Sequence, residues 1–165
     1  MKNRVLPILT CFAVWMTCWF YGNTVFAQGD GTASNPYQIS TAEQLVSFAE
    51  CIGSGNPFYY ADGTCLLNAP TEGNYSTIPA RGEGTYFRLM NDITLNNGNL
   101  AACDGEIDPA WTVWPETGVF KGHFLGESHM VSGMYIERPE GSVGVGFFSK
   151  VEGNALIERL GIVNS

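Results

Sequence analysis

Basic residues are scarce in this 165-residue sequence: eight Lys and Arg stand against 16 Asp and Glu, a formal net charge of −8. A nucleic-acid-binding surface needs clustered basic side chains to neutralise phosphates, so this balance excludes nucleic acid as a partner. Charged residues make up only 15% of the chain, whereas the hydrophobic content of 45% is too high for a disordered protein. The length favours one folded domain, and the 20 glycines indicate many turns.

Long hydrophobic runs are absent except for residues 5–21, which follow two basic residues near the N-terminus. Val25 and Ala27 then fit the small-residue positions of a signal-peptidase site. We therefore predict that residues 1–27 are a secretory signal peptide. After its cleavage the protein should not be stably inserted in a membrane, and it should be secreted or displayed on the bacterial cell surface. The remaining residues, 28–165, carry a formal charge of −10, because the signal contains two of the basic residues and no acid.

Cysteine is sparse in the expected mature chain, which retains only Cys51, Cys65 and Cys103. An exported chain meets an oxidising compartment, so one disulfide is expected. A Cys51–Cys65 bond is the first choice because it closes a short, irregular loop, and Cys65–Cys103 is the alternative. Three buried free thiols are a further interpretation.

One amphipathic helix is predicted over residues 41–52, with an apolar face to bury that consists of Ala42, Leu45, Val46, Ala49 and Ile52. Ser40 and Glu43 have the spacing of a capping box, and glycines at 53 and 55 end the helical pattern. Two segments on the C-terminal side of this helix, 53–84 and 96–118, show no sustained periodicity and are predicted to be long loops.

The last part of the chain contains short predicted strands separated by nine glycines between Gly118 and Gly161. Apolar residues recur with the same offsets in two places there, Val131, Met134 and Ile136, and Ile157, Leu160 and Ile162, and in one place earlier in the chain, Met90, Ile93 and Leu95. A repeat of short strands with glycine at the corners is typical of a β-solenoid, in which equivalent apolar residues stack between rungs.

The stretch from Phe120 to Ile136 resembles a hallmark segment of GLUG-motif right-handed β-helix proteins of bacterial surfaces, and residues 146–165 resemble the GLUG repeat itself. Leu125, Glu127 and Ser128 depart from the usual turn residues of that motif. The resemblance implies an all-β fold, a right-handed parallel β-helix (β-solenoid) of about three rungs, with an N-terminal amphipathic helix that caps its first rung. The C-terminal end lacks an equivalent cap, so we expect residues 28–165 to be the N-terminal part of a longer protein, marginally stable or self-associating when expressed alone.

Candidate binding chemistry lies in the two predicted loops. Tyr59, Tyr60, Trp111 and Trp114 could stack on a sugar or anchor a host or cell-surface protein, although the two Trp residues could instead form a lid on the core. An irregular calcium site is a weaker hypothesis, based on the alternating acids Asp104, Glu106 and Asp108. No other cofactor is indicated.

Catalytic motifs are missing from the sequence: it contains no nucleophile elbow and no cysteine–histidine spacing of a known type. We therefore predict a non-catalytic exported surface scaffold, an adhesin-like protein that presents binding loops. The alternative is the N-terminal part of a β-helix carbohydrate-active enzyme, a polysaccharide lyase or hydrolase.

Overall fold

The computed structural model describes residues 29–96 and 108–165. One α-helix, α1 (Ala42–Ser54), follows the first strand, β1 (Tyr37–Ile39). The chain then forms β2 (Phe58–Ala61), β3 (Thr64–Leu66), β4 (Tyr75–Ile78), a 3-10 turn (Ala80–Gly82), β5 (Tyr86–Leu89) and β6 (Ile93–Thr94). The second described part contains β7 (Val119–Phe120), β8 (His123–Leu125), β9 (Met130–Ser132), β10 (Lys150–Val151), β11 (Leu156–Glu158) and β12 (Gly161–Val163).

The helix forms close to where the sequence predicts it, with its capping box one residue further along. The Thr41 hydroxyl accepts a hydrogen bond from the backbone N–H of Gln44 at 3.2 Å. In return the Gln44 side-chain oxygen accepts from the backbone N–H groups of Ser40 and Thr41. The predicted pair, Ser40 with Glu43, is therefore wrong by one position. Gly55, with φ of 70°, ends the helix in the left-handed conformation that glycine adopts without strain.

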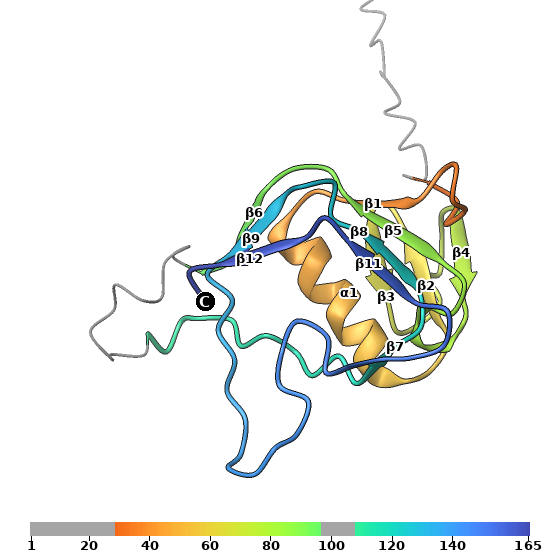
Figure 1. Ribbon diagram of the computed structural model, residues 1–165. Coiled ribbons are helices and arrows are strands. Elements are labelled where there is room, and N and C mark those ends of the chain that lie inside the picture. Colours follow the sequence, from red (N-terminus) through yellow and green to blue (C-terminus); the bar gives the residue numbers. More distant parts are fainter. Residues whose placement is uncertain (1–28, 97–107) are drawn as a thin grey trace, which may run out of the picture.

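Figure 1 shows α1 running between the strands rather than lying outside them. Its buried face presents Leu45, Phe48, Ala49, Cys51 and Ile52 to the core. The Phe48 ring lies 4.7 Å from the Phe87 ring of β5 and 5.4 Å from the Phe124 ring of β8, measured between centroids. Because aromatic contacts of this kind join the helix to two strands, α1 is part of the central core.

The parallel strands form three small sheets. The largest has the order β1-β5-β8-β11, and the others have the orders β12-β9-β6 and β10-β7. Every neighbouring pair in these sheets is parallel, and the register places Phe124 of β8 between Phe87 of β5 and Ile157 of β11. Side chains at matching positions are therefore stacked along each sheet.

Residues 53–84 contain an antiparallel sheet with the order β3-β2-β4, so the prediction of a long irregular loop there is wrong. The hairpin between β2 and β3 turns at Asp62 and Gly63, which both have positive φ, of 50° and 83°. Asp-Gly is a preferred sequence for a two-residue hairpin turn. The Asp-Gly pair is thus a sequence signal for this hairpin, although the polar composition of the surrounding segment is typical of a loop.

The prediction of an all-β parallel β-helix is also wrong. The described residues form a mixed α/β fold with one helix and several small sheets, both parallel and antiparallel. The repeat signal comes only from residues 90–95 and 131–162, whereas α1 and the β2–β4 sheet, which carry no repeat, supply much of the core. The predicted alignment of the repeat is wrong as well: Val131 pairs with Ile162, not with Ile157, which pairs with Phe124.

The turn from β8 to β9 shows how the sequence departs from ideal turn chemistry. Glu127 and Ser128 have positive φ, of 53° and 69°, and the His129 N–H donates to the Gly126 carbonyl at 2.8 Å. This is the pattern of a type I′ turn, in which glycine is preferred at the second central position. The Glu127 carboxylate also forms an ion pair with Arg159 at 2.6 Å, so the Glu127 side chain contributes to the turn. Ser128 is exposed, and its side chain makes no such contact.

We expect the Ser128→Gly substitution to raise the free energy of unfolding by about 0.5 to 1 kcal/mol, because it removes the steric cost of a left-handed L-residue. Chemical denaturation of both proteins measures the difference. Ser142→Gly, in the exposed turn after Pro139, is the control and should not stabilise the protein, since the Ser142 hydroxyl donates to the Pro139 carbonyl at 2.7 Å. An unchanged or lower stability of the Ser128 variant would contradict this account of the turn.

Candidate functional site

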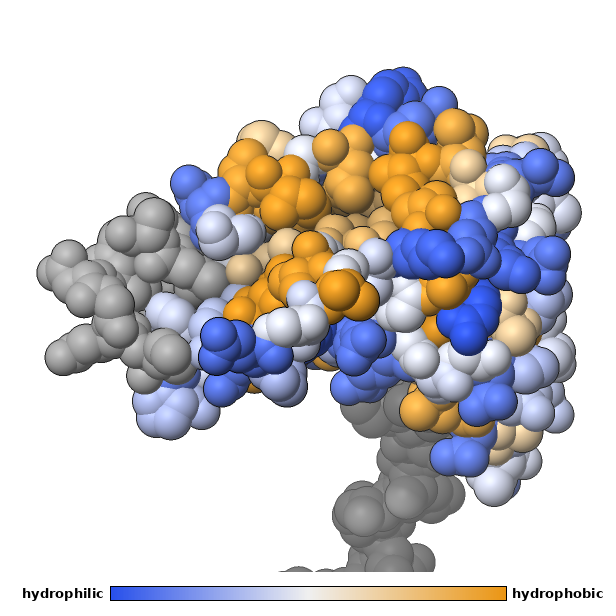
Figure 2. Space-filling model, turned by 60° about the horizontal axis from the view of Figure 1, so that its bottom comes forward, coloured by the Kyte–Doolittle hydropathy of each residue, from blue (hydrophilic) through white to orange (hydrophobic). Residues whose placement is uncertain are grey.

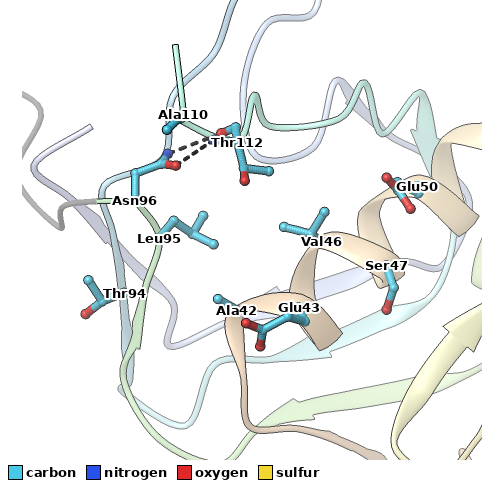
Figure 3. A pocket seen from close by; sticks show the side chains of 10 residues that line it. All are labelled: Ala42, Glu43, Val46, Ser47, Glu50, Thr94, Leu95, Asn96, Ala110 and Thr112. Atoms are coloured by element: carbon cyan, nitrogen blue, oxygen red, sulfur yellow. Dashed lines mark hydrogen bonds between the residues drawn. The ribbon is translucent and has the colours of Figure 1, made fainter. Parts of the chain in front are cut away.

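A cleft of about 540 Å³ lies between the outer face of α1 and two chain segments that approach it from the other side. The volume is in the range of small-molecule binding sites. Figure 3 shows the ten residues that line the cleft: Ala42, Glu43, Val46, Ser47 and Glu50 from α1, Thr94, Leu95 and Asn96 at and after β6, and Ala110 and Thr112.

One wall of the cleft is fixed by the side chain of Asn96. Its amide Nδ2 donates to the carbonyl oxygens of Thr112 and Gly133, at 3.2 Å and 2.9 Å, and its Oδ1 accepts from the Thr112 N–H at 2.7 Å. Asn96 has φ of 48°, a left-handed conformation that asparagine tolerates better than most residues. The segment at 110–112 is therefore held against the end of β6 by two hydrogen bonds from the Asn96 side chain, and the third joins the same side chain to Gly133.

The floor of the cleft is apolar. Val46 of α1 and Leu95 point toward one another across it (Figure 3). Leu95 is positioned by its backbone N–H, which donates to the Ser132 carbonyl at 2.8 Å. Val46 is half-buried, whereas the helix pattern alone placed it on the fully buried face.

Two exposed carboxylates, Glu43 and Glu50, stand at the rim on the same face of α1. A hydrogen bond from its own backbone N–H, and a second from the Thr41 hydroxyl, lower the pKa of Glu43 below its usual value. Its position in the first turn of the helix also favours the charged form. No lysine, arginine or histidine belongs to the described lining, so the cleft is acidic at neutral pH.

Trp114, a predicted binding residue, belongs to the core. It is 1% exposed, its ring stacks on Phe147 with centroids 4.8 Å apart, and its indole N–H donates to the Phe147 carbonyl at 3.1 Å. Trp111 is only half-buried and packs edge-on against Tyr135, outside the cleft lining. Trp114 is therefore a core residue and not the predicted binding residue, whereas Trp111 stays a candidate for ligand binding at the surface.

Tyr59 and Tyr60 belong to β2 and not to a loop. Tyr60 is 2% exposed, stacks on Tyr37 and donates its hydroxyl hydrogen to the Gln38 carbonyl, so its prediction as a binding residue is wrong. Tyr59 is half-buried against Tyr75. Since adjacent residues of a strand point to opposite faces, only one of the two tyrosines can reach the surface.

The calcium hypothesis concerns residues that fall mostly outside the described part. Asp104 and Glu106 lie outside it, and Asp108 is exposed and accepts a hydrogen bond from the Ala110 N–H at 2.8 Å. Within residues 29–96 and 108–165 no three acidic, histidine or cysteine side chains are grouped as a metal site would require. The calcium site stays a prediction.

Cys51 and Cys65 are buried neighbours, with free thiols in this structure. Burial, together with a hydrogen bond to the Cys51 thiol, raises the pKa of the Cys65 thiol well above its usual value. The helix and β3 thus bring together the two cysteines that the sequence pairs first. Cys103, the alternative partner, lies outside the described residues.

The cleft residues were not among the predicted site residues. Glu43 was assigned only to helix capping, and Val46 only to the buried face. The available signal was the spacing of Glu43, Val46, Ser47 and Glu50, which places all four on one side of the helix. What they face is decided by Asn96 and Thr112, which are distant in sequence.

Comparisons with known proteins give a limited result. No family model matches the chain, and no solved structure matches it, so the GLUG resemblance stays a prediction. The chain is similar to a protein from Evansella cellulosilytica named "Putative Gly-rich membrane protein", with 25% identity over 159 residues. The alignment covers 94% of this chain and 14% of that relative, so the chain spans a small part of the relative's length. Among the described residues, no helix has the length and apolar character needed to cross a bilayer.

Proposed function

We propose that this chain is a non-catalytic binding module of an exported surface protein, and that the cleft between α1 and residues 94–96 and 110–112 holds a glycan. The observation that carries the proposal is the lining of this cleft. It combines an apolar floor with carboxylate and hydroxyl groups at the rim, on walls fixed by the Asn96 hydrogen bonds.

The chemistry of the lining favours one class of glycan. Sugar hydroxyls can donate to the carboxylates of Glu43 and Glu50 and exchange hydrogen bonds with the Thr94 and Thr112 hydroxyls. The C–H face of a sugar ring can pack on Val46. Acidic polysaccharides would be repelled by the two carboxylates and by the negative net charge of the chain. The ligand is therefore a neutral or amino-sugar-containing glycan.

The state of Glu43 argues against one catalytic role for this residue, that of a general acid. A general acid in a glycosidase needs a raised pKa so that it holds a proton at neutral pH. The pKa of Glu43 is instead lowered by its hydrogen bonds, so this carboxylate acts as an acceptor. A binding site that only recognises hydroxyl groups needs such an ionised acceptor.

Export is supported by residues 1–27, with their basic start, apolar run and small-residue end. The name of the Evansella relative, a membrane protein, agrees with a location in the cell envelope. The excess of acidic residues suits a protein displayed outside the cell, where no nucleic-acid contact is needed.

The proposal predicts that Glu43→Gln and Glu50→Gln each weaken glycan binding about tenfold, because each removes a charge-assisted hydrogen bond of about 1.5 kcal/mol. A glycan array with neutral, amino-sugar and acidic glycans identifies the ligand, and calorimetry measures the affinities. In the Glu50→Gln variant, where Glu43 is the remaining carboxylate of the rim, the residual binding should persist as pH falls to the ordinary carboxyl range and be lost only below it, because the pKa of Glu43 is lowered.

Glu72→Gln is the matched control, because Glu72 is exposed and lies outside the cleft. It should bind like the original protein. Binding that is unaffected by both cleft substitutions would overturn the site. Release of a cleaved sugar product would overturn the non-catalytic assignment in favour of a carbohydrate-active enzyme.

A further inference from the structure

The last three strands form one open edge of the molecule. β11, β12 and β10 each stand at the end of a parallel sheet, next to β8, β9 and β7. Within the described residues, no strand pairs with the far side of any of the three. An open strand edge is a template for pairing with another chain.

The backbone of this edge has hydrogen-bonding groups free at regular positions. In β11 the Leu156 N–H donates to the Gly122 carbonyl and the Glu158 carbonyl accepts from the Gly126 N–H, at 3.1 Å and 2.8 Å. Since a strand in a parallel pair uses alternate residues for its partner, the N–H and C=O of Ile157 point the other way. In β12 the Gly161 N–H donates to the His129 carbonyl. The N–H and C=O of the next residue, Ile162, therefore also point away from the inner strand.

The same positions carry apolar side chains that are left uncovered. The register places Ile157 on Phe124, Ile162 on Val131 and Val151 of β10 on Phe120. The three inner residues are each 0% exposed, whereas Ile157, Ile162 and Val151 are 38%, 37% and 44% exposed. Each outer residue therefore continues a buried stack and forms its last, unfilled layer.

Exposed apolar side chains are concentrated in this part of the chain. Of the eleven large hydrophobic residues that are exposed within the described part of the chain, six lie after residue 140: Val143, Val145, Val151, Leu156, Ile157 and Ile162. On the face that Figure 2 shows, apolar surface is gathered into patches between hydrophilic side chains. Patches of this kind mark interaction surfaces.

The charge of the edge identifies the kind of partner. Residues 149–165 contain two basic side chains, Lys150 and Arg159, and two acidic ones, Glu152 and Glu158, whereas the whole chain carries −8. Lys150 is paired with Glu152, and Arg159 with Glu127 at 2.6 Å. With Glu127 counted, the edge is close to neutral, with three acidic side chains against two basic ones, so two copies of this acidic protein repel one another less here than over most other surfaces.

We propose that a second copy of this chain covers the edge, related by a two-fold axis. The layer formed by Val151, Ile157 and Ile162 packs on the same residues of the other copy, and the free backbone groups of β11 pair antiparallel with its equivalent. A two-fold interface uses one surface twice, so each copy must present both the apolar layer and balanced charges. Both requirements are met by these strands.

The test is the oligomeric state of the purified protein, measured by light scattering and sedimentation from low micromolar to submillimolar concentration. We expect a mass twice that of the chain. The double substitution Ile157→Lys and Ile162→Lys should halve the mass while the circular dichroism spectrum stays the same, since both side chains already reach solvent. In hydrogen exchange, the Ile157 and Ile162 amides should become protected as the concentration rises, whereas Glu158 and Val163, which face the inner strands, should be protected throughout.

Val143→Lys is the control, because Val143 is 91% exposed and lies outside the three strands. It should leave the dimer intact. A monomer at every concentration, a dimer that survives the double substitution, or an open-ended polymer would each overturn the two-fold pairing. If the double variant fails to fold, the concentration dependence of exchange in the original protein decides, and exchange at Ile157 that does not change with concentration overturns the proposal.

Discussion

Replacement of Trp114 by alanine is expected to lower the free energy of unfolding by about 3 to 5 kcal/mol, the range for a large aromatic residue removed from a core. Its ring stacks on Phe147, and its indole N–H satisfies the Phe147 carbonyl. Its backbone N–H donates to the Tyr135 carbonyl at 2.6 Å, and its own carbonyl accepts from Arg138 at 2.8 Å. The substitution therefore leaves a cavity where the segment around Trp114 packs against the segment that contains Tyr135 and Phe147. Chemical denaturation, monitored by far-UV circular dichroism rather than by tryptophan fluorescence, measures the loss of stability.

Trp111→Ala is the matched control, since both residues are tryptophans of one segment. Trp111 is half-buried and contacts Tyr135 edge-on, so its removal should cost only about 1 kcal/mol. If Trp111→Ala destabilises the protein as much as Trp114→Ala, the distinction between core and surface at this segment is wrong. A loss of ligand binding in a folded Trp111 variant would extend the recognition surface beyond the cleft.

Under the proposed export, reduction of the mature chain is expected to lower its free energy of unfolding by about 3 kcal/mol, because a Cys51–Cys65 bond would close a loop of about 15 residues. The two thiols lose two protons and two electrons to a disulfide oxidant of the export compartment, which becomes a dithiol. Burial raises the pKa of the Cys65 thiol, so its reactive thiolate is rare in the folded chain. We therefore expect the bond to form before folding is complete.

Two variants, compared with the original protein, distinguish the pairings. The melting temperature should fall with reductant in the original protein and in Cys103→Ala, but not in the Cys51→Ala, Cys65→Ala double variant. Mass spectrometry of unreduced peptides should show 51 joined to 65, with one free thiol per chain. Loss of the reductant effect in Cys103→Ala would favour the Cys65–Cys103 bond, and three free thiols in the exported protein would contradict any bond.

Local signals predicted several elements because they depend on neighbouring residues only. The helix is confirmed, since its apolar spacing and its cap lie within one segment. The capping box is also local, although it forms one residue further along than predicted. The strands in residues 53–84 are only three or four residues long and are separated by polar turns, so their periodicity is too short to detect, and strand pairing supplies the stability that the composition of the segment does not indicate.

The sequence by itself determined the position of the one helix, the short apolar strands and the excess of acidic charge, because each follows from composition or from spacing over a few residues. Only the tertiary structure decided what these elements face. The mixed fold, the burial of Trp114 and Tyr60, the cleft beside α1 and the uncovered layer on β10–β12 all depend on contacts between distant segments. Such contacts are set by packing and by the register of the parallel strands. Val131 pairs with Ile162, but a register that paired it with Ile157 would fit the apolar pattern of the sequence equally well.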